Sequence, residues 1–185
     1  MTDKPNDILL LAGKVLTILM QGLMACAALT LIIVGPLAAV MSDTINAEMV
    51  ADYGSKVAPM PISAILALFA CALVAVVLVF FFFGKLRAII SSVAEGEPFL
   101  PENANRINAM AWLLAALQVA KFVLGAAAVP VATWASTIES EDLHISTDFS
   151  SGFDLTSILM VVVLFILARV FRHGAAMRAD LEGTV

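Results

Sequence analysis

The sequence is poor in charged residues, and it contains only two cysteines and two histidines. Of its 185 residues, 14% are charged and 62% are hydrophobic, whereas a soluble domain has roughly 25% charged and 45–50% apolar residues. The two cysteines provide neither a disulfide framework nor a metal site. The apolar excess is too large for one water-soluble core of this size. The sequence therefore predicts a protein that is surrounded by a lipid bilayer.

Four long apolar stretches predict an all-α, polytopic membrane protein, with a four-helix transmembrane bundle in a single domain over residues 1–185. The stretches cover residues 15–41, 62–83, 109–134 and 155–171. A helix needs about 20 apolar residues to cross the hydrocarbon, and none of the stretches alternates as a barrel strand does. The first stretch is too long for the core of a signal peptide, so we expect it to remain as a span.

Basic residues near the ends of the predicted spans indicate the orientation. Eight of the ten lie in the N-terminal segment, the central loop and the C-terminal tail: Lys4, Lys14, Lys85, Arg87, Arg106, Arg169, Arg172 and Arg178. Lys56 alone lies between the first two spans, and no basic residue lies between the last two. The positive-inside rule therefore predicts that both termini and the central loop face the cytoplasm.

Two segments next to the spans are predicted to form short amphipathic cytoplasmic helices. Residues 85–95 place four apolar residues at helical spacing on one face: Leu86, Ile89, Ile90 and Val93. Gly96 is expected to end this helix. Residues 174–181 repeat the pattern more weakly. Such helices lie on the membrane or cap the bundle, or they offer a docking face to a cytoplasmic partner, and the sequence leaves both interpretations open.

The central loop, residues 96–107, has the composition of a well-formed connection between two helices. Pro98 prevents the preceding helix from continuing, whereas Pro101 suits the first turn of the next helix. Glu102 complements the positive end of that helix. Arg106 follows four residues later, which is the spacing of an ion pair with Glu102.

The same loop carries a family resemblance. Its residues Gly96-x-Pro98-Phe99-x-x-Glu102-Asn103-x-x-Arg106-Ile107 resemble the signature loop of a bacterial membrane family catalogued as domain of unknown function 2975. Ile107 departs mildly from that signature, which usually has leucine there. The chain's ending, from Phe153 to Val185, also resembles the end of that family.

The resemblance implies a four-span protein of the bacterial cytoplasmic (inner) membrane, without an established biochemical activity. Genes of the family often lie beside one for a small helix-turn-helix transcription regulator. The resemblance therefore implies a cytoplasmic partner of that kind, which the membrane protein restrains or signals to.

Two sets of residues are candidates for function. One is a cytoplasmic interaction loop: Pro98, Phe99, Glu102, Asn103 and Arg106. The other is an intramembrane polar pair, Gln118 and Lys121. A lysine deep in a span costs about 2.5–3.5 kcal/mol, so Lys121 is expected to face the bundle interior or water. It either snorkels or hydrogen-bonds within the bundle, or it contacts an ion, lipid or ligand.

The sequence contains no catalytic pair, phosphate-binding loop or metal-ligand spacing, so we expect neither an enzyme nor a cofactor or bound metal. The leading hypothesis is a regulatory or scaffold partner of a cytoplasmic helix-turn-helix transcription regulator, without direct nucleic acid binding. The alternative is a small transporter or ion pathway around Lys121.

Other expected partners are the lipid bilayer and, as an open alternative, further copies of the chain. Four residues near the end of the last span are typical of an anchor on anionic lipid: Arg169, Arg172, His173 and Arg178. The acidic segment 139–154, which includes His144, is either a solvated loop or a segment that binds a divalent cation or senses cationic peptides.

Overall fold

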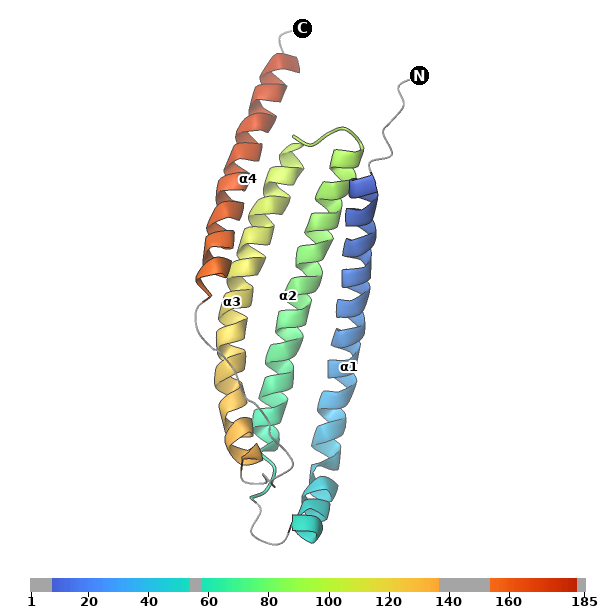
Figure 1. The fold of residues 1–185 in the computed structure, drawn as a ribbon, viewed down its shortest axis with the longest axis vertical. Helices are drawn as coiled ribbons and strands as arrows, with labels where there is room; N and C mark the ends of the chain where they lie inside the picture. The colour runs from blue at the N-terminus through green and yellow to red at the C-terminus, as the bar shows by residue number, and fades with distance from the viewer. Residues whose placement is uncertain (1–7, 54–57, 137–153, 183–185) are drawn as a thin grey trace. The chain divides into compact units, whose positions relative to one another are not determined.

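The computed structural model describes residues 8–53, 58–136 and 154–182. These residues form four helices: α1 (Ile8–Tyr53), α2 (Ile62–Ala94), α3 (Pro101–Ala135) and α4 (Leu155–Glu182) (Figure 1). Each helix is long and apolar enough to cross a membrane. The chain is therefore an all-α, multi-pass membrane protein, as the apolar stretches predict. Residues 139–153, with His144, lie outside the part of the chain that the structure describes.

The helices extend beyond the apolar stretches that predict them. Helix α2 continues past Phe83 to Ala94, and α4 continues past Phe171 to Glu182. The predicted amphipathic segments are therefore the ends of α2 and α4, rather than separate helices. The physical reason is that apolar composition defines only the part that crosses the hydrocarbon, whereas a helix persists until a stop signal such as Gly96.

The described helices cluster into two compact units. Unit 1 contains described residues of the ranges 1–26, 77–118 and 154–185, and unit 2 contains those of the ranges 27–76 and 119–153. Unit 1 thus comprises the start of α1, the end of α2, the start of α3 and all of α4. The start of α1, the loop between α2 and α3, and the end of α4 lie at one end of this unit, which we call the loop end (Figure 1). The single domain over residues 1–185 stays a prediction.

The buried residues of unit 1 are mostly small. Its buried apolar residues are Ala104, Ile107, Met110, Ala111, Ala168 and Ala175. Small residues let membrane helices approach closely, which matters because lipid gives no hydrophobic drive between them. A Cβ atom on Gly13 would lie 3.3 Å from Ile90 Cδ1, and one on Gly84 would lie 3.1 Å from Gln21 Nε2. Helices α1 and α2 therefore pack closely in this unit.

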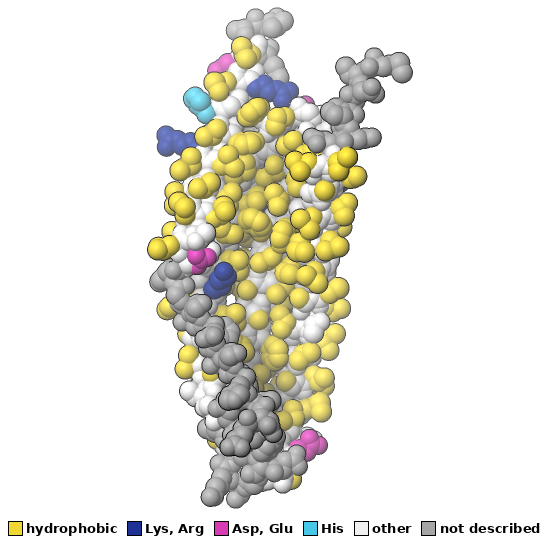
Figure 2. All heavy atoms as spheres, in the orientation of Figure 1, with side chains coloured by type: hydrophobic (Ala, Val, Ile, Leu, Met, Phe, Trp, Pro, Cys, Tyr) yellow, Lys and Arg dark blue, Asp and Glu magenta, His cyan; other side chains and the backbone are white. Residues whose placement is uncertain are grey.

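Large apolar side chains of unit 1 point outward. On α1, Leu16 and Leu19 are 57% and 59% exposed, and Ile166 on α4 is 58% exposed. The visible surface of the described helices is largely apolar, and basic side chains and a histidine appear near the loop end of α4 (Figure 2). This distribution suits helices whose solvent is hydrocarbon rather than water.

In unit 2, the residues that precede α2 form hydrogen bonds with α1 and α3. Trp134 Nε1 on α3 donates a hydrogen bond to the carbonyl oxygen of Ala58 (2.9 Å). The backbone N–H of Met60 donates to Asn46 Oδ1 on α1 (2.8 Å). The start of α2 is therefore fixed by polar contacts, although most of the helix is apolar.

Asp154 caps the N-terminus of α4. Its Oδ1 accepts a hydrogen bond from the backbone N–H of Thr156 (3.0 Å), and its Oδ2 accepts one from the Ser157 hydroxyl. The Ser157 hydrogen bond lowers the pKa of Asp154, because it stabilises the charged carboxylate. A lowered pKa in the folded state means that the carboxylate stabilises the helix end above the unfolded pKa, about 3.9, and that this contribution is lost as pH falls through the folded value.

We therefore expect Asp154→Ala to increase amide hydrogen exchange in the first turn of α4, because the orphan N–H groups lose their acceptor. Asp154→Asn is the matched control and should leave exchange close to that of the wild type near neutral pH, because asparagine is an equally good cap. Equal exchange in the alanine variant and the wild type would contradict the capping role.

Candidate functional site

The connection from α2 to α3 begins with a Schellman turn. Gly96 has a φ angle of 85°, a left-handed conformation that other residues rarely adopt. Its N–H donates to the carbonyl oxygen of Val93 (3.0 Å), and the N–H of Glu97 donates to that of Ser92 (2.9 Å). These bonds satisfy carbonyl groups at the end of the helix. The predicted helix end at Gly96 is confirmed, as is the predicted start of the next helix at Pro101.

A buried polar cluster joins α2, the loop and α3. Asn103 is 0% exposed and Ser92 is 4% exposed. The Asn103 amide donates to Ser92 Oγ (2.7 Å) and to the carbonyl oxygen of Pro98 (3.0 Å). Asn103 Oδ1 accepts a hydrogen bond from Arg106 Nη1 (2.8 Å), which also donates to the carbonyl oxygen of Ala88 (3.3 Å). We call these five residues the Asn103 cluster.

The cluster is fully satisfied. No buried side-chain nitrogen or oxygen atom in the described ranges lacks a hydrogen-bond partner. A buried polar group left without a partner costs about 1–3 kcal/mol, so a satisfied network favours one arrangement over its alternatives. The Asn103 cluster therefore holds the α2–α3 hairpin in a single geometry.

This geometry divides the predicted interaction loop into two groups. Asn103 and Arg106 make hydrogen bonds within the hairpin, and Pro98 provides an acceptor to it, so these three residues have a structural role. Glu102 is exposed and Phe99 is 43% exposed. An interaction role outside the chain stays a prediction for all five residues, of which Phe99 and Glu102 are the exposed ones.

The expected ion pair between Glu102 and Arg106 does not form in the described structure. The spacing is correct, but Arg106 points inward and donates to Asn103 and to a backbone carbonyl of α2. The physical reason is that a charged hydrogen bond to a buried amide oxygen is worth more than an exposed ion pair, which contributes little.

Phe99 connects the loop to α4. Its ring centroid lies 5.6 Å from that of Phe171. A Cβ atom on Gly174 would come within 2.9 Å of Phe99 Cδ1, so the ring occupies the space that a side chain at position 174 would need. Further along α3, the Trp112 ring packs edge-to-face on Phe165, with centroids 5.4 Å apart. Aromatic contacts thus join α4 both to the loop and to α3.

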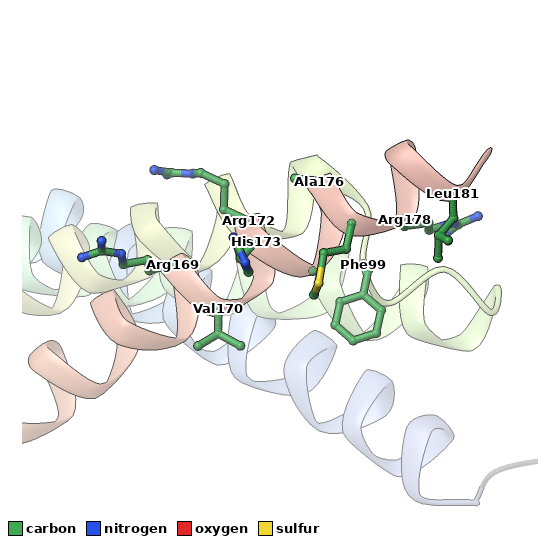
Figure 3. A pocket seen from close by; sticks show the side chains of 10 residues that line it. Phe99, Arg169, Val170, Arg172, His173, Ala176, Arg178 and Leu181 are labelled. Carbon is green, nitrogen blue, oxygen red and sulfur yellow. The ribbon is translucent and has the colours of Figure 1, made fainter. Parts of the chain in front are cut away.

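An open groove of about 1200 Å³ runs along α4 beside Phe99. We call it the α4 groove; its apolar lining includes Phe99, Val170, Met177 and Leu181, and its basic lining comprises Arg169, Arg172, His173 and Arg178. The guanidinium group of Arg172 projects away from the Phe99 ring (Figure 3). Arg178 lies 3.8 Å from Glu97, an exposed pair of small energetic value. The groove thus combines an apolar strip with a cationic edge.

Basic residues from all four helices lie at one level of unit 1. The level follows from three contacts across helix pairs: Gly13 with Ile90, Arg106 with Ala88, and Gly174 with Phe99. At about 1.5 Å of rise per residue, the basic residues fall within a band roughly 10 Å deep. We call it the basic band: Lys14, Lys85, Arg87, Arg106, Arg169 and Arg172.

We expect the basic band to lie at the membrane surface, because exposed cationic side chains such as Lys85, Arg87 and Arg172 can extend to lipid headgroups. Met177 and Leu181 follow the band on α4, on the side away from the apolar spans. We therefore expect that part of the α4 groove to lie outside the hydrocarbon, where exposed apolar side chains are unfavourable.

The predicted intramembrane pair lies on α3. Gln118 is half-buried and Lys121 is exposed. The sequence predicts the bundle interior or water as the environment of Lys121, and its exposed side chain does not lie in the interior of the described helices. A functional role of the pair stays a prediction.

Ser92 and Gly174 are essential to the site, but their sequence pattern does not single them out. Ser92 is one of two serines at the end of an apolar helix, and this polar interruption is the available signal. Gly174 gives no signal for its role, because its contact with Phe99 depends on how α4 packs against the loop.

The chain matches the model of a protein family described as Protein of unknown function (DUF2975), over residues 44–185. The chain belongs to this family. The match includes the central loop and the ending of the chain, so the resemblance of these segments to DUF2975 is confirmed. Comparisons with curated proteins and with solved structures found no match. DUF2975 membership therefore defines the family but assigns no activity.

In this DUF2975 chain, Asn103→Leu removes the hydrogen bonds at the centre of the Asn103 cluster while keeping the branching of the side chain. We expect the free energy of unfolding to fall by about 2–4 kcal/mol, because buried donors and acceptors lose their partners. Reversible denaturation in detergent micelles measures this change. Asn105→Leu, at an exposed position of the same helix turn, is the control and should change stability by less than about 0.5 kcal/mol. Equal losses would contradict a structural role of Asn103.

Gly174→Ala is expected to displace the Phe99 ring and to lower the free energy of unfolding by about 1–2 kcal/mol, as overpacking does. A fluorine label on the ring, read by NMR, reports the displacement. Gly22→Ala is the control, because a Cβ atom there would meet nothing within 4 Å. If the two alanine variants behave alike, Phe99 does not depend on Gly174.

Proposed function

We propose that the chain is a non-enzymatic membrane regulatory or scaffold protein that binds a cytoplasmic helix-turn-helix transcription regulator. In this proposal the spans lie in the bacterial inner membrane, and the loop end, with both chain termini, faces the cytoplasm. The observation that supports it most directly is the α4 groove, which presents apolar side chains beyond the basic band.

The apolar strip of the groove has the residue spacing of a helix-binding surface. Phe99, Met177 and Leu181 are 43%, 54% and 71% exposed. On α4, Val170, Met177 and Leu181 are spaced by seven and four residues, so they lie along one stripe of the helix. Contiguous apolar surface in contact with water is typical of interaction sites. An amphipathic helix of the partner would bury it.

The cationic edge favours an acidic partner. Arg169, Arg172 and His173 line the same groove and are exposed. Charge complementarity across an interface steers encounter and fixes orientation, so the matching helix should carry acidic residues beside its apolar face. A basic surface of a DNA-binding regulator remains free when such a helix binds, and the membrane protein then controls where the regulator resides rather than contacting nucleic acid.

Photo-crosslinking in native membranes tests the proposal. A photoreactive residue at Met177 or Leu181 should capture a cytoplasmic protein with a helix-turn-helix domain, identified by mass spectrometry. Leu9 is the control position, because it is 80% exposed on α1 near the loop end but lies outside the α4 groove. Reading the neighbouring genes gives an independent candidate for the captured protein.

Phe99→Ser and Met177→Ser should each weaken co-purification of the captured regulator about tenfold, because each removes a side chain that burial stabilises by about 1.5–3 kcal/mol. Leu9→Ser should leave it unchanged. The proposal fails if no transcription regulator is crosslinked from Met177 or Leu181, or if the yield from Leu9 is equal.

A further inference from the structure

A second groove, of about 610 Å³, lies between α2 and α3 of unit 1. Its lining residues are Phe81, Lys85, Asn108, Ala109, Trp112, Leu113 and Ala116. It shares no residue with the α4 groove, and only Lys85 of its lining belongs to the basic band. We call it the α2–α3 groove.

The α2–α3 groove changes from polar to apolar along its length. Lys85 and Asn108 lie at the end nearest the loop, because α2 runs towards the loop and α3 runs away from it. Phe81, Leu113 and Ala116 lie deeper along the same two helices, on the side of the apolar spans. The order of polar and apolar groups is therefore that of a phospholipid in a membrane leaflet, with headgroup outward and acyl chains inward.

The shape of the groove suits an acyl chain. Ala109 and Ala116 give it a shallow floor of small side chains, and the larger Phe81 and Trp112 stand beside that floor at 54% and 64% exposure. The edge-to-face contact with Phe165 holds the Trp112 ring in place. Tryptophan at this depth is typical of the membrane interface, where its amphipathic ring contacts both headgroups and chains.

The polar end of the groove lacks a negative charge. Lys85 is exposed, and across the described ranges no acidic side chain lies within ion-pair distance of it. The half-buried Asn108 adds an amide that can donate hydrogen bonds. A lysine ammonium beside an amide donor is a suitable site for a phosphate group, which lysine binds as a point charge.

We propose that the α2–α3 groove binds one anionic glycerophospholipid. Lys85 and Asn108 hold its phosphate and headgroup, and an acyl chain lies on the alanine floor between Phe81 and Trp112. This lipid site goes beyond the docking of a regulator and does not rest on it, because the two grooves have no lining residue in common.

Native mass spectrometry of the full chain, released from detergent, tests the site with two added lipids of identical chains, palmitoyl-oleoyl phosphatidylglycerol and palmitoyl-oleoyl phosphatidylcholine. We expect the first bound lipid to be retained more strongly when it is phosphatidylglycerol. Lys85→Gln should lower that retention about fivefold, which is the contribution of one cation near an anionic headgroup. Inorganic phosphate at the same concentration should not displace the lipid, because it lacks the acyl chain.

Arg87→Gln is the matched control, because Arg87 is an exposed cation two residues further on α2 and does not line the groove. Ala116→Leu tests the apolar end: it fills the floor with the charge intact and should lower retention of both lipids. Equal losses in Lys85→Gln and Arg87→Gln, equal retention of both lipids by the wild type, unchanged retention in Ala116→Leu, or displacement by phosphate would each overturn the proposal.

Discussion

The hydrogen bonds of Asn103 are the interaction on which the loop end depends. One buried side chain binds Ser92 of α2, the carbonyl oxygen of Pro98 and the guanidinium of Arg106, so three segments share a single polar centre. Because a shift of the hairpin would break these bonds and leave the buried Asn103 amide without its partners, the cluster fixes the loop. The loop in turn places Phe99 against α4, where the absent side chain of Gly174 makes room for its ring. The wall of the α4 groove is therefore a consequence of packing that starts at Asn103.

The energetic cost of an exposed apolar side chain differs between the two sides of the basic band. If the band marks the membrane surface, exposed residues on the span side, such as Ile166, contact hydrocarbon at no cost. Met177 and Leu181, which are exposed on the loop side, would then contact water, and their burial would be favourable. This physical distinction, rather than exposure alone, makes the end of α4 a candidate interface. By the same distinction, exposed apolar residues within the span of α1 do not indicate a binding site.

The sequence predicts the elements of the fold better than it predicts the site. The length of the apolar stretches identifies all four spans. Gly96 marks the end of α2 and Pro101 marks the start of α3, because these signals act locally. The roles of the loop residues depend instead on contacts between helices. Asn103 in a polar loop motif suggests an exposed residue, yet Ser92 and Pro98 surround its amide. Both grooves likewise depend on how neighbouring helices pack, which periodicity along one helix cannot give.

The two grooves are separate surfaces, but both depend on the geometry of the α2–α3 hairpin. Asn108 lies two residues from Arg106 on α3, and Lys85 lies three residues from Ala88, whose carbonyl oxygen accepts from Arg106. A lipid that binds only the paired helices stabilises their pairing by mass action, and therefore also stabilises the Asn103 cluster. A regulator bound at the α4 groove requires the same hairpin geometry through Phe99. Thermodynamic linkage then gives two cases. If the hairpin opens to a measurable extent, each ligand raises the affinity of the chain for the other ligand. If the hairpin stays closed, the two ligands bind independently. Under these two proposals, the strength of the Asn103 cluster determines whether lipid binding and regulator binding are coupled or independent.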